Sequence, residues 1–352
     1  MTARVEPPER GSAMLRIGII GLGFMGKMHF DTYQALPDKA RVTAIADVDP
    51  KKRAGDWSGI GGNLDMAGGA ADLTGVRMYE NADDLIADPD VDVVDITLPT
   101  YLHCEYTLKA LAAGKDTLCE KPMAVTAADA RKMAEAAVGA GRILLIGQCI
   151  RFWPAYAKAR ELVRGGAYGA VRTARFQRYS TLPRWSWDNW LIQADKSGLA
   201  ALDLHIHDAD FVAYLFGMPE SVSSFGGGVN PGGWDHIVTR YLYPGDALIT
   251  AEGAWEYAPG FPFSMTFAIH MDKASLHLAA DGGLTLYPTE SGSPENVPVA
   301  EGSGYWHEMV HFLDCIENRK KSDVLTAESA MDSVRLVEAE IESARSGKPV
   351  GL

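Results

Sequence analysis

Cysteine is scarce in this chain of 352 residues, and the four cysteines that it contains show no pairing pattern. Cys104, Cys119, Cys149 and Cys315 form no C-x-x-C motif, which argues against a disulfide framework, a zinc ribbon and a thiol redox site. We therefore expect free thiols and a cytoplasmic location. Cys119 adjoins a candidate catalytic residue, but cysteine often fills small buried sites, so a nucleophilic role is the weaker interpretation.

Long apolar runs and an excess of basic charge are also absent. No stretch approaches the length of about 20 apolar residues that spans a membrane, and residues 1–13 hold no apolar core of a secretory signal. The formal net charge is −13, whereas nucleic acids and anionic membranes bind basic surfaces. Neither is expected as a partner. Residues 1–13 are predicted to be a disordered extension.

The rest of the composition is that of a globular protein, with 47% hydrophobic and 22% charged residues in a length that suggests two domains. Residues 14–150 alternate two patterns, which predicts an α/β domain whose parallel sheet is covered on both faces. The glycine-rich residues 55–75 break this alternation. We interpret them as an insertion, more as loop decoration than as a substrate lid or a subunit contact. The expected strands are 15–20, 42–47, 92–98, 115–119 and 143–147, and the expected helices are 25–36, 101–113 and 126–140.

Residues 151–352 have a different pattern, which predicts a second domain of the α+β class. Short alternating segments indicate a large open sheet, antiparallel or mixed. We expect this domain to bind substrate and to mediate oligomerisation, and its C-terminal helix could pack back on the first domain. The expected strands are 171–179, 221–226, 237–243, 248–255, 263–270 and 274–279, and the expected helices are 155–164, 199–216, 305–318 and 326–346.

The most informative motif is a short apolar run that leads into Gly21-Leu22-Gly23-Phe24-Met25-Gly26. This strand–turn–helix pattern predicts a dinucleotide site, because the first glycine allows the turn, Gly23 lets a pyrophosphate approach and Gly26 lets the helix pack closely. Asp47 ends the next predicted strand, where a carboxylate binds ribose hydroxyls and repels a 2′-phosphate. We therefore favour NAD over NADP, although residues 51–53 (Lys-Lys-Arg) could reach a phosphate.

Two polar clusters are candidates for chemistry. Lys121 follows the strand predicted at 115–119, and ligands of open α/β sheets bind beyond the carboxyl ends of strands, so it should point into the cofactor cleft. Asp203 and His207 are one turn apart on a predicted helix, where the imidazole can accept a hydroxyl proton. They could instead be an internally satisfied polar pair. No metal is expected, because His205 and His207 lack the i, i+4 spacing of helical ligand pairs and Asp208 alone does not supply it.

An aromatic segment precedes this predicted helix. Trp185, Trp187 and Trp190 lie among polar residues, and their indole faces could stack on the apolar faces of a sugar. Arg184 and its polar neighbours could then bind hydroxyl groups. Packing between the two domains is the alternative explanation for these tryptophans.

Together these residues resemble the glucose–fructose oxidoreductase/inositol dehydrogenase family (Gfo/Idh/MocA) over about residues 14–352. The resemblance rests on the glycine motif, Pro99-Thr100-Tyr101-Leu102-His103, Glu120-Lys121-Pro122, Arg151, Asp203-x-x-x-His207 and the ending Ser346-Gly347-Lys348-Pro349-Val350. It implies a Rossmann domain followed by a domain with a large open, mainly antiparallel sheet that often forms a subunit interface. His205 replaces a small residue of the family pattern, which puts the shape of the pocket in doubt.

The resemblance also implies roles for single residues. Lys121 belongs to the catalytic proton network, Asp203 binds substrate and His207 is the general base. Arg151 lies where the domains meet and joins Arg184, Trp185 and Trp187 as a candidate substrate residue. The expected cofactor-binding residues are Gly21, Gly23, Phe24, Met25, Gly26, Asp47, Pro99, Thr100, His103, Glu120 and Lys121.

We therefore expect an NAD-dependent oxidoreductase that acts on a hydroxyl carbon of a sugar, sugar derivative or cyclitol and assembles as a homodimer or homotetramer. One alternative is an enzyme with tightly bound NAD that uses transient oxidation for glycoside cleavage, elimination or epimerisation. Another is a non-catalytic NAD-binding regulatory protein. The sequence leaves open the substrate, the carbon oxidised and the direction of the reaction.

Overall fold

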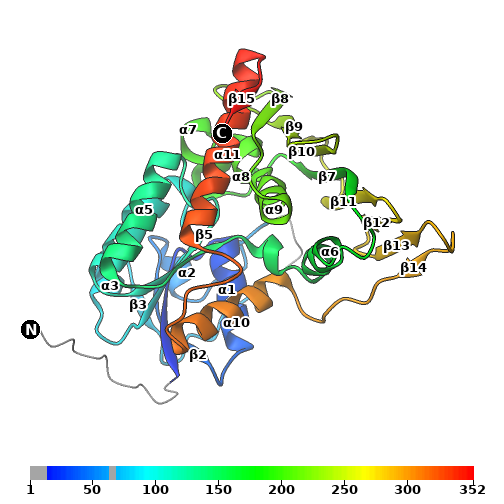
Figure 1. The fold of residues 1–352 in the computed structure, drawn as a ribbon. Coiled ribbons are helices and arrows are strands. Elements are labelled where there is room, and N and C mark those ends of the chain that lie inside the picture. The colour runs from blue at the N-terminus through cyan, green and yellow to red at the C-terminus, as the bar shows by residue number, and fades with distance from the viewer. Residues whose placement is uncertain (1–13, 63–68) are drawn as a thin grey trace, which may run out of the picture.

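In a computed structural model, which describes residues 14–62 and 69–352, the first part of the chain forms a parallel sheet covered by helices (Figure 1). The expectations for residues 1–13 and for 63–68 of the insertion lie outside the described residues. The six strands have the order β3-β2-β1-β4-β5-β6. They are β1 (Leu15–Ile20), β2 (Ala40–Ala46), β3 (Arg77–Tyr79), β4 (Val93–Ile96), β5 (Asp116–Glu120) and β6 (Leu144–Gly147).

Local sequence explains these elements well. All four residues of β4 are buried, as expected for a strand covered on both faces. Helix α5 starts at Thr126, whose side chain accepts a hydrogen bond from the Asp129 amide, and ends at Gly141 with φ 61°. The helices here are α1 (Phe24–Gln34), α2 (Pro50–Arg53), α3 (Ala82–Ala87), α4 (Thr100–Ala112) and α5 (Ala127–Ala140). Helices α2 and α3 and strand β3 were not predicted, because each is too short to show a periodicity.

The second part of the chain forms a mixed sheet of nine strands in the order β14-β13-β12-β11-β7-β10-β9-β8-β15. Strands β7 and β10 are parallel neighbours, and the other pairs are antiparallel. This confirms the predicted fold class. The strands are β7 (Val171–Thr181), β8 (Ser221–Gly227), β9 (His236–Leu242), β10 (Leu248–Tyr257), β11 (Ser264–Met271), β12 (Ala274–Leu278), β13 (Leu284–Pro288), β14 (Glu295–Asn296) and β15 (Val350–Gly351).

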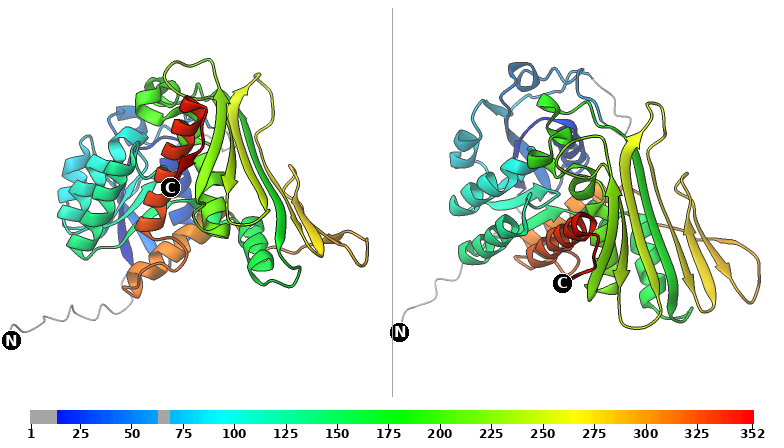
Figure 2. Two further views of the ribbon diagram at one scale, coloured as in Figure 1. Left: turned by 45° about the horizontal axis from the view of Figure 1, so that its top comes forward. Right: turned by 90° about the horizontal axis from the view of Figure 1, so that it is seen from above.

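Helices cover one face of this sheet and leave the other face open, as the two views in Figure 2 show. The C-terminal helix α11 contacts α5 as well as β8 and α9, so it connects the two sheets. The 3-10 turns are η1 (Cys149–Phe152) and η2 (Trp187–Ile192). The helices are α6 (Pro154–Arg164), α7 (Ala194–Ser197), α8 (Leu199–Asp203), α9 (Ile206–Phe216), α10 (Gly304–Glu317) and α11 (Ala327–Ser346).

The single helix predicted over 199–216 is wrong in one respect, because the structure breaks it between α8 and α9 at Leu204 and His205. The His205 side chain is fully buried, and its Nε2 lies 2.8 Å from Oε2 of Glu340 in α11. Gly253 of β10 makes room for it, since a Cβ atom there would lie 2.7 Å from the His205 Cβ. The break therefore follows from tertiary packing around His205.

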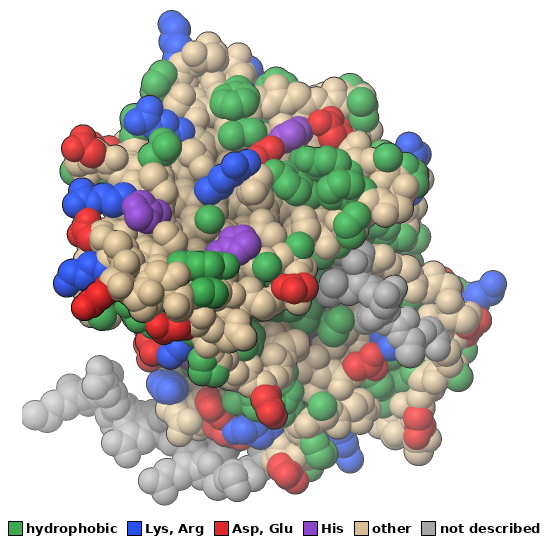
Figure 3. All heavy atoms as spheres, turned by 90° about the vertical axis from the view of Figure 1, so that its right-hand side faces the viewer, with side chains coloured by type: hydrophobic (Ala, Val, Ile, Leu, Met, Phe, Trp, Pro, Cys, Tyr) green, Lys and Arg blue, Asp and Glu red, His purple; other side chains and the backbone are tan. Residues whose placement is uncertain are grey.

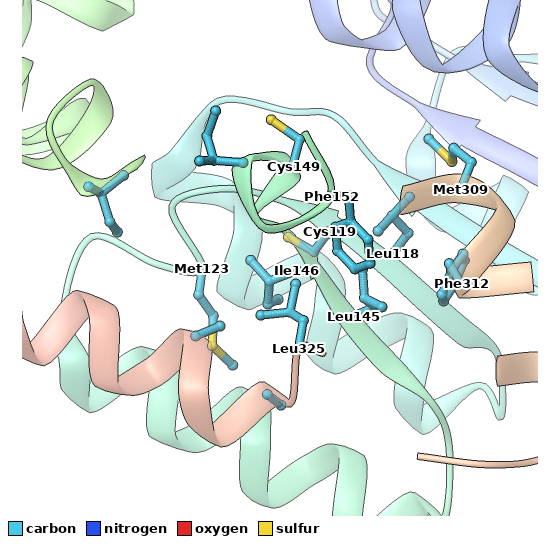
Figure 4. Packing of buried hydrophobic residues seen from close by; sticks show 14 of the residues in the cluster. Leu118, Cys119, Met123, Leu145, Ile146, Cys149, Phe152, Met309, Phe312 and Leu325 are labelled. Atoms are coloured by element: carbon cyan, nitrogen blue, oxygen red, sulfur yellow. The ribbon is translucent and has the colours of Figure 1, made fainter. Parts of the chain in front are cut away.

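The core behind β5 is apolar and contains two of the cysteines. Cys119 and Cys149 lie among Leu118, Ile146 and Phe152 (Figure 4). Burial raises the pKa of the Cys119 thiol, which leaves it protonated and supports a packing role over a nucleophilic one. All four cysteines are free thiols. Of the helices formed by the described residues, none has the length and apolar character needed to cross a membrane.

Candidate active site

One large cavity, of about 790 Å³, lies where the carboxyl ends of the parallel strands face the second sheet. Residues from β1, β2, β5 and the segment that follows β4 line one side of it, and residues from β7, β10, α8 and α9 line the other. This is the position at which open α/β sheets bind ligands. The wall includes Gly21, Gly23, Phe24, Met25, Asp47, Pro99, Glu120, Lys121, Arg178, Trp185, Trp187, Asp203 and His207.

The glycine loop has the shape that a bound dinucleotide requires. Gly21 has φ +92°, which favours glycine, and a Cβ atom on Gly26 would lie 2.0 Å from the Gly21 carbonyl oxygen. A Cβ atom at Gly23 would meet no atom within 4 Å, so the backbone there is open to the cavity. Helix α1 starts at Gly23 without a side-chain cap and without an acidic residue in its first turn. These residues fit a pyrophosphate, which accepts hydrogen bonds from free helix N–H groups.

Asp47 follows β2 and links the glycine loop to the rim of the cavity. Its Oδ2 accepts a hydrogen bond from the Leu22 amide at 2.6 Å, and its Oδ1 accepts one from the Asp49 amide at 2.8 Å. The nearby basic residues are already engaged, because Arg53 donates to the Asp47 carbonyl and lies 3.4 Å from Glu80, and Lys52 Nζ lies 3.9 Å from Asp47. A carboxylate therefore dominates the charge at this edge.

The predicted catalytic residues come together at the other end of the cavity. Lys121 Nζ donates to the Asp203 carbonyl oxygen at 2.7 Å and to Asp203 Oδ1 at 3.2 Å, across the two parts of the chain. His207 lines the same wall. Burial, helped by the charges of Lys121 and Arg178, holds the pKa of His207 well below its ordinary value of 6.5. Its imidazole is therefore neutral at neutral pH and can accept a proton.

The residues expected along the cofactor divide into two groups. Pro99 lines the cavity, whereas Thr100 and His103 are buried outside its wall. The ring nitrogens of His103 lie 2.8 Å from the carbonyl oxygens of Leu98 and Pro122. Its effect on a bound cofactor would therefore pass through the two loops that it holds.

Glu120 has a partner that sequence reasoning missed. His29 of α1 is fully buried, with Nε2 3.0 Å from Glu120 Oε1 and Nδ1 2.9 Å from Asp95 Oδ2 of β4. Burial alone would lower the pKa of His29, but the two carboxylates raise it to about 10. Glu120 Oε2 in turn accepts from the Lys121 amide at 3.0 Å. The only sequence signal was a histidine three residues after Gly26.

The residues of the aromatic segment differ in whether they line the cavity. Trp185, Trp187 and Trp190 line the cavity, whereas Arg184 is exposed and lies outside the wall. Trp255 of β10 is a further wall residue, which the sequence did not single out because strands often bury tryptophan. Its Nε1 donates to Asp235 at 2.7 Å, so its ring is fixed.

Arg151, a candidate substrate residue by the resemblance, lies away from the cavity. Its guanidinium is buried and forms two hydrogen bonds with Asp210 of α9, at 2.9 and 2.7 Å. Nη1 donates to the Val324 carbonyl and to Ser329 Oγ at the start of α11. With these bonds made, the structure gives Arg151 a role in joining elements.

Further differences from the sequence-based predictions concern the wall of the cavity. His205 points away from the cavity toward Glu340, so its side chain is not part of the wall. Gly59, Ile60 and Gly61 of the insertion line the cavity. Arg178 of β7, which the sequence did not single out, is also a wall residue.

Comparison with known proteins gives matches over most of the chain. Residues 15–148 match the model of an oxidoreductase family with an NAD-binding Rossmann fold, and residues 156–277 match the GFO/IDH/MocA C-terminal domain. The chain is 30% identical to levoglucosan dehydrogenase of Pseudarthrobacter phenanthrenivorans over 300 residues, which cover 74% of this chain and 73% of that protein.

Two further relatives extend this comparison. An inositol 2-dehydrogenase of Rubrobacter xylanophilus is 35% identical over 160 residues, which cover 45% of this chain and only 42% of that protein. A solved structure described as levoglucosan dehydrogenase in complex with NADH and levoglucosan matches the fold with a TM-score of 0.83. It has 24% sequence identity, and the match covers 96% of this chain and 99% of the other.

Proposed function

Because this chain belongs to the Gfo/Idh/MocA family of NAD-binding oxidoreductases, we propose that it is an NAD-dependent dehydrogenase that oxidises a hydroxyl-bearing carbon of a sugar, sugar derivative or cyclitol. The observation that carries the proposal is that Lys121, Asp203 and His207 meet in the cavity that also contains the glycine loop. The named relatives, a levoglucosan and an inositol dehydrogenase, support this substrate class.

The chemistry is divided between cofactor and protein. NAD, when bound, accepts a hydride from the substrate carbon. His207, neutral because of its buried position, takes the proton of the hydroxyl group on the same carbon, so the C–O bond becomes a carbonyl. Lys121 donates a hydrogen bond to the oxygen as negative charge develops on it. Asp203 holds the Lys121 ammonium and orients the substrate hydroxyl.

The proposal is tested by incubating the purified protein with NAD and a panel of sugars, sugar acids and cyclitols while NADH absorbance is followed. Lys121→Ala and His207→Ala should each lower kcat by about 100-fold or more, the usual contribution of acid–base groups, and leave NAD binding nearly unchanged. Arg164→Ala, a change of an exposed residue at the end of α6, is the control. Full turnover in either variant would remove that residue from the mechanism.

The same experiment separates the proposal from the two alternatives. NAD that survives purification, with substrate changed but no net NADH formed, would indicate internal redox cycling. Binding of NAD without conversion of any compound would indicate a regulatory protein.

Self-association and location complete the proposal. Large apolar side chains such as Phe225 and Leu248 point from the open face of the nine-stranded sheet, and Figure 3 shows that face with apolar, charged and histidine side chains interspersed. We infer a homodimer or homotetramer through this face, which light scattering should show and Phe225→Glu/Leu248→Glu should weaken. The free thiols support a cytoplasmic location, to be tested by cell fractionation.

A further inference from the structure

Arg178 is an unusual component of the cavity wall because it is a charged side chain that is only 2% exposed. It lies in β7, and the neighbouring element that holds it is α9. Nε donates to Asp208 Oδ2 at 2.8 Å, and Nη2 donates to Asp208 Oδ1 at 3.2 Å. Asp208 is fully buried and directly follows His207 in the sequence. The pair therefore ties β7 to the helix that carries the proposed base.

The geometry of this pair leaves one edge of the guanidinium for another partner. A guanidinium is planar, so the edge formed by Nε and Nη2 faces Asp208, and Nη1 points away from that carboxylate. Nη1 donates to the sulfur of Met265 at 3.4 Å, and Met265 lines the same cavity; the buried Tyr156 hydroxyl also lies near the guanidinium. A thioether is a weak acceptor, and Nη1 carries two N–H groups. A ligand oxygen in the cavity could therefore accept a strong hydrogen bond from Nη1.

Stability alone is a poor explanation for this arrangement. A buried ion pair loses hydration on both partners, and replacing such a pair with apolar residues of similar volume is often neutral or stabilising. In this wall the pair also stands close enough to His207 for the Arg178 charge to act on the imidazole. A fixed guanidinium and a positive charge near the proposed base are both useful at a reacting centre.

We propose that Arg178 is a further substrate-binding residue, fixed by Asp208 so that Nη1 donates a hydrogen bond to an uncharged oxygen of the substrate beside His207. The proposal rests on the proposed dehydrogenase function. The oxygen should be uncharged, because Asp208 already balances the charge of Arg178 and Asp203 balances the charge of Lys121. A hydroxyl or ring oxygen meets this requirement, whereas a carboxylate or phosphate would face no unbalanced cation from these two residues.

The test compares variants of the pair with variants of another pair on the same strand. Arg178→Met/Asp208→Leu removes both charges together, so that neither is left buried alone, and Arg178→Lys keeps the charge without the fork. Arg172→Met/Asp272→Leu is the control, since Arg172 of β7 is exposed and pairs with Asp272 at 2.6 Å. Circular dichroism and NADH fluorescence would establish folding and cofactor binding for each variant.

With a neutral compound that the wild type oxidises, the Arg178→Met/Asp208→Leu variant should lose about tenfold or more in kcat/KM, the cost of one hydrogen bond to a charged group. The acid limb of its kcat/KM profile should also move to higher pH, because removing the nearby cation makes His207 easier to protonate. Because Arg178→Lys keeps the cation, it should leave that limb in place while kcat/KM still falls through loss of the hydrogen bond to substrate. Wild-type values in the folded variant would overturn the proposal.

Two other outcomes distinguish this proposal from the function on which it rests. Preference for a sugar acid over the matching neutral sugar would overturn the assignment to an uncharged oxygen and leave the dehydrogenase intact. If no compound yields NADH, the dehydrogenase proposal fails. The role of Arg178 in ligand binding is then tested by NMR, with myo-inositol added to the NADH-loaded protein. The Arg178 Nε–H resonance should shift, and an unmoved resonance would overturn this role.

Discussion

Single side chains at the cavity hold backbone in place while they face the ligand, and Asp47 is one of them. Its two carboxylate oxygens accept hydrogen bonds from the amides of Leu22 and Asp49, so it fixes the glycine loop from the end of β2. The same carboxylate would repel a 2′-phosphate. The position of the glycine loop and the exclusion of a 2′-phosphate therefore both depend on Asp47.

We predict that Asp47→Ser narrows the preference for NAD over NADP by about tenfold or more, because it removes a charged acceptor and its repulsion of a phosphate. The ratio of the two dissociation constants, measured by tryptophan fluorescence, checks this without a substrate. Asp72→Ser, a change of an exposed carboxylate in the same part of the chain, should leave the ratio unchanged. A constant ratio in Asp47→Ser would mean that this carboxylate does not select the cofactor.

At the scale of elements, His29 joins α1 to two strands of the first sheet. Its ring lies between Asp95 of β4 and Glu120 of β5, and all three side chains are buried. Because its pKa is raised from 6.5 to about 10, the folded state keeps a proton that the unfolded chain loses. Its contribution to stability is complete below pH 6.5 and disappears as the pH rises toward 10.

We therefore predict that His29→Ala lowers the free energy of unfolding by about 3 kcal/mol near neutral pH, because two buried carboxylates lose their cation. Urea unfolding followed between pH 6.5 and 10 should show stability falling in the wild type and a flatter profile in the variant. His270→Ala, at an exposed histidine of β11, should match the wild type. Identical profiles for His29→Ala and the wild type would show that His29 is not charged in the folded state.

The junction between α8 and α9 depends on a glycine in a neighbouring strand. A Cβ atom on Gly253 would lie 2.7 Å from the Cβ of His205, the residue at the break between the two helices. The break sets the relative position of Asp203, which ends α8, and His207, which lies in the first turn of α9.

Gly253→Ala should therefore cost about 1–3 kcal/mol of stability by overpacking and lower kcat by up to about 100-fold by displacing Asp203 and His207. Thermal unfolding and turnover measure the two effects. Gly227→Ala in β8 is the matched control, since a Cβ atom there meets nothing within 4 Å. A stable variant with normal turnover would show that the junction tolerates the methyl group.

At the scale of the whole molecule, the cavity exists only if the two sheets keep a fixed position relative to each other. Lys121 directly follows β5 of the first sheet, and Asp203 is the last residue of α8 in the second part of the chain. Both line the cavity, and the hydrogen bonds between them join the two parts. Arg151 supplies a second connection, from η1 to Asp210 in α9 and to the start of α11. Helix α11 in turn packs against α5 of the first part.

We predict that Arg151→Met lowers the free energy of unfolding by about 3 kcal/mol, because Asp210 is left charged and buried, with little change in the substrate KM. Arg151→Met/Asp210→Leu should recover most of the loss, and Arg164→Met at an exposed site at the end of α6 should have no effect. Urea denaturation and steady-state kinetics provide the measurements. A large rise in KM with unchanged stability would instead place Arg151 in substrate binding.

Much of the fold could be predicted because it depends on local pattern. The run that ends at Gly26 specifies strand, turn and helix within a few residues, and the cap at Thr126 and the stop at Gly141 are equally local. The ends of the parallel strands then place Lys121 at the cavity. Short elements such as β3 and β14 escaped prediction because two or three residues carry no measurable period.

The sequence by itself determined the dinucleotide-binding motif, the order of the main elements and the polar residues available for chemistry. Only the tertiary structure decided which of them meet. It turned His205 toward Glu340, buried Arg151 against Asp210 and set Arg178 beside Asp208 in the cavity wall. The physical reason is that burial and pairing join residues far apart in the chain. Strand pairing and helix packing set these contacts, and no local pattern records them.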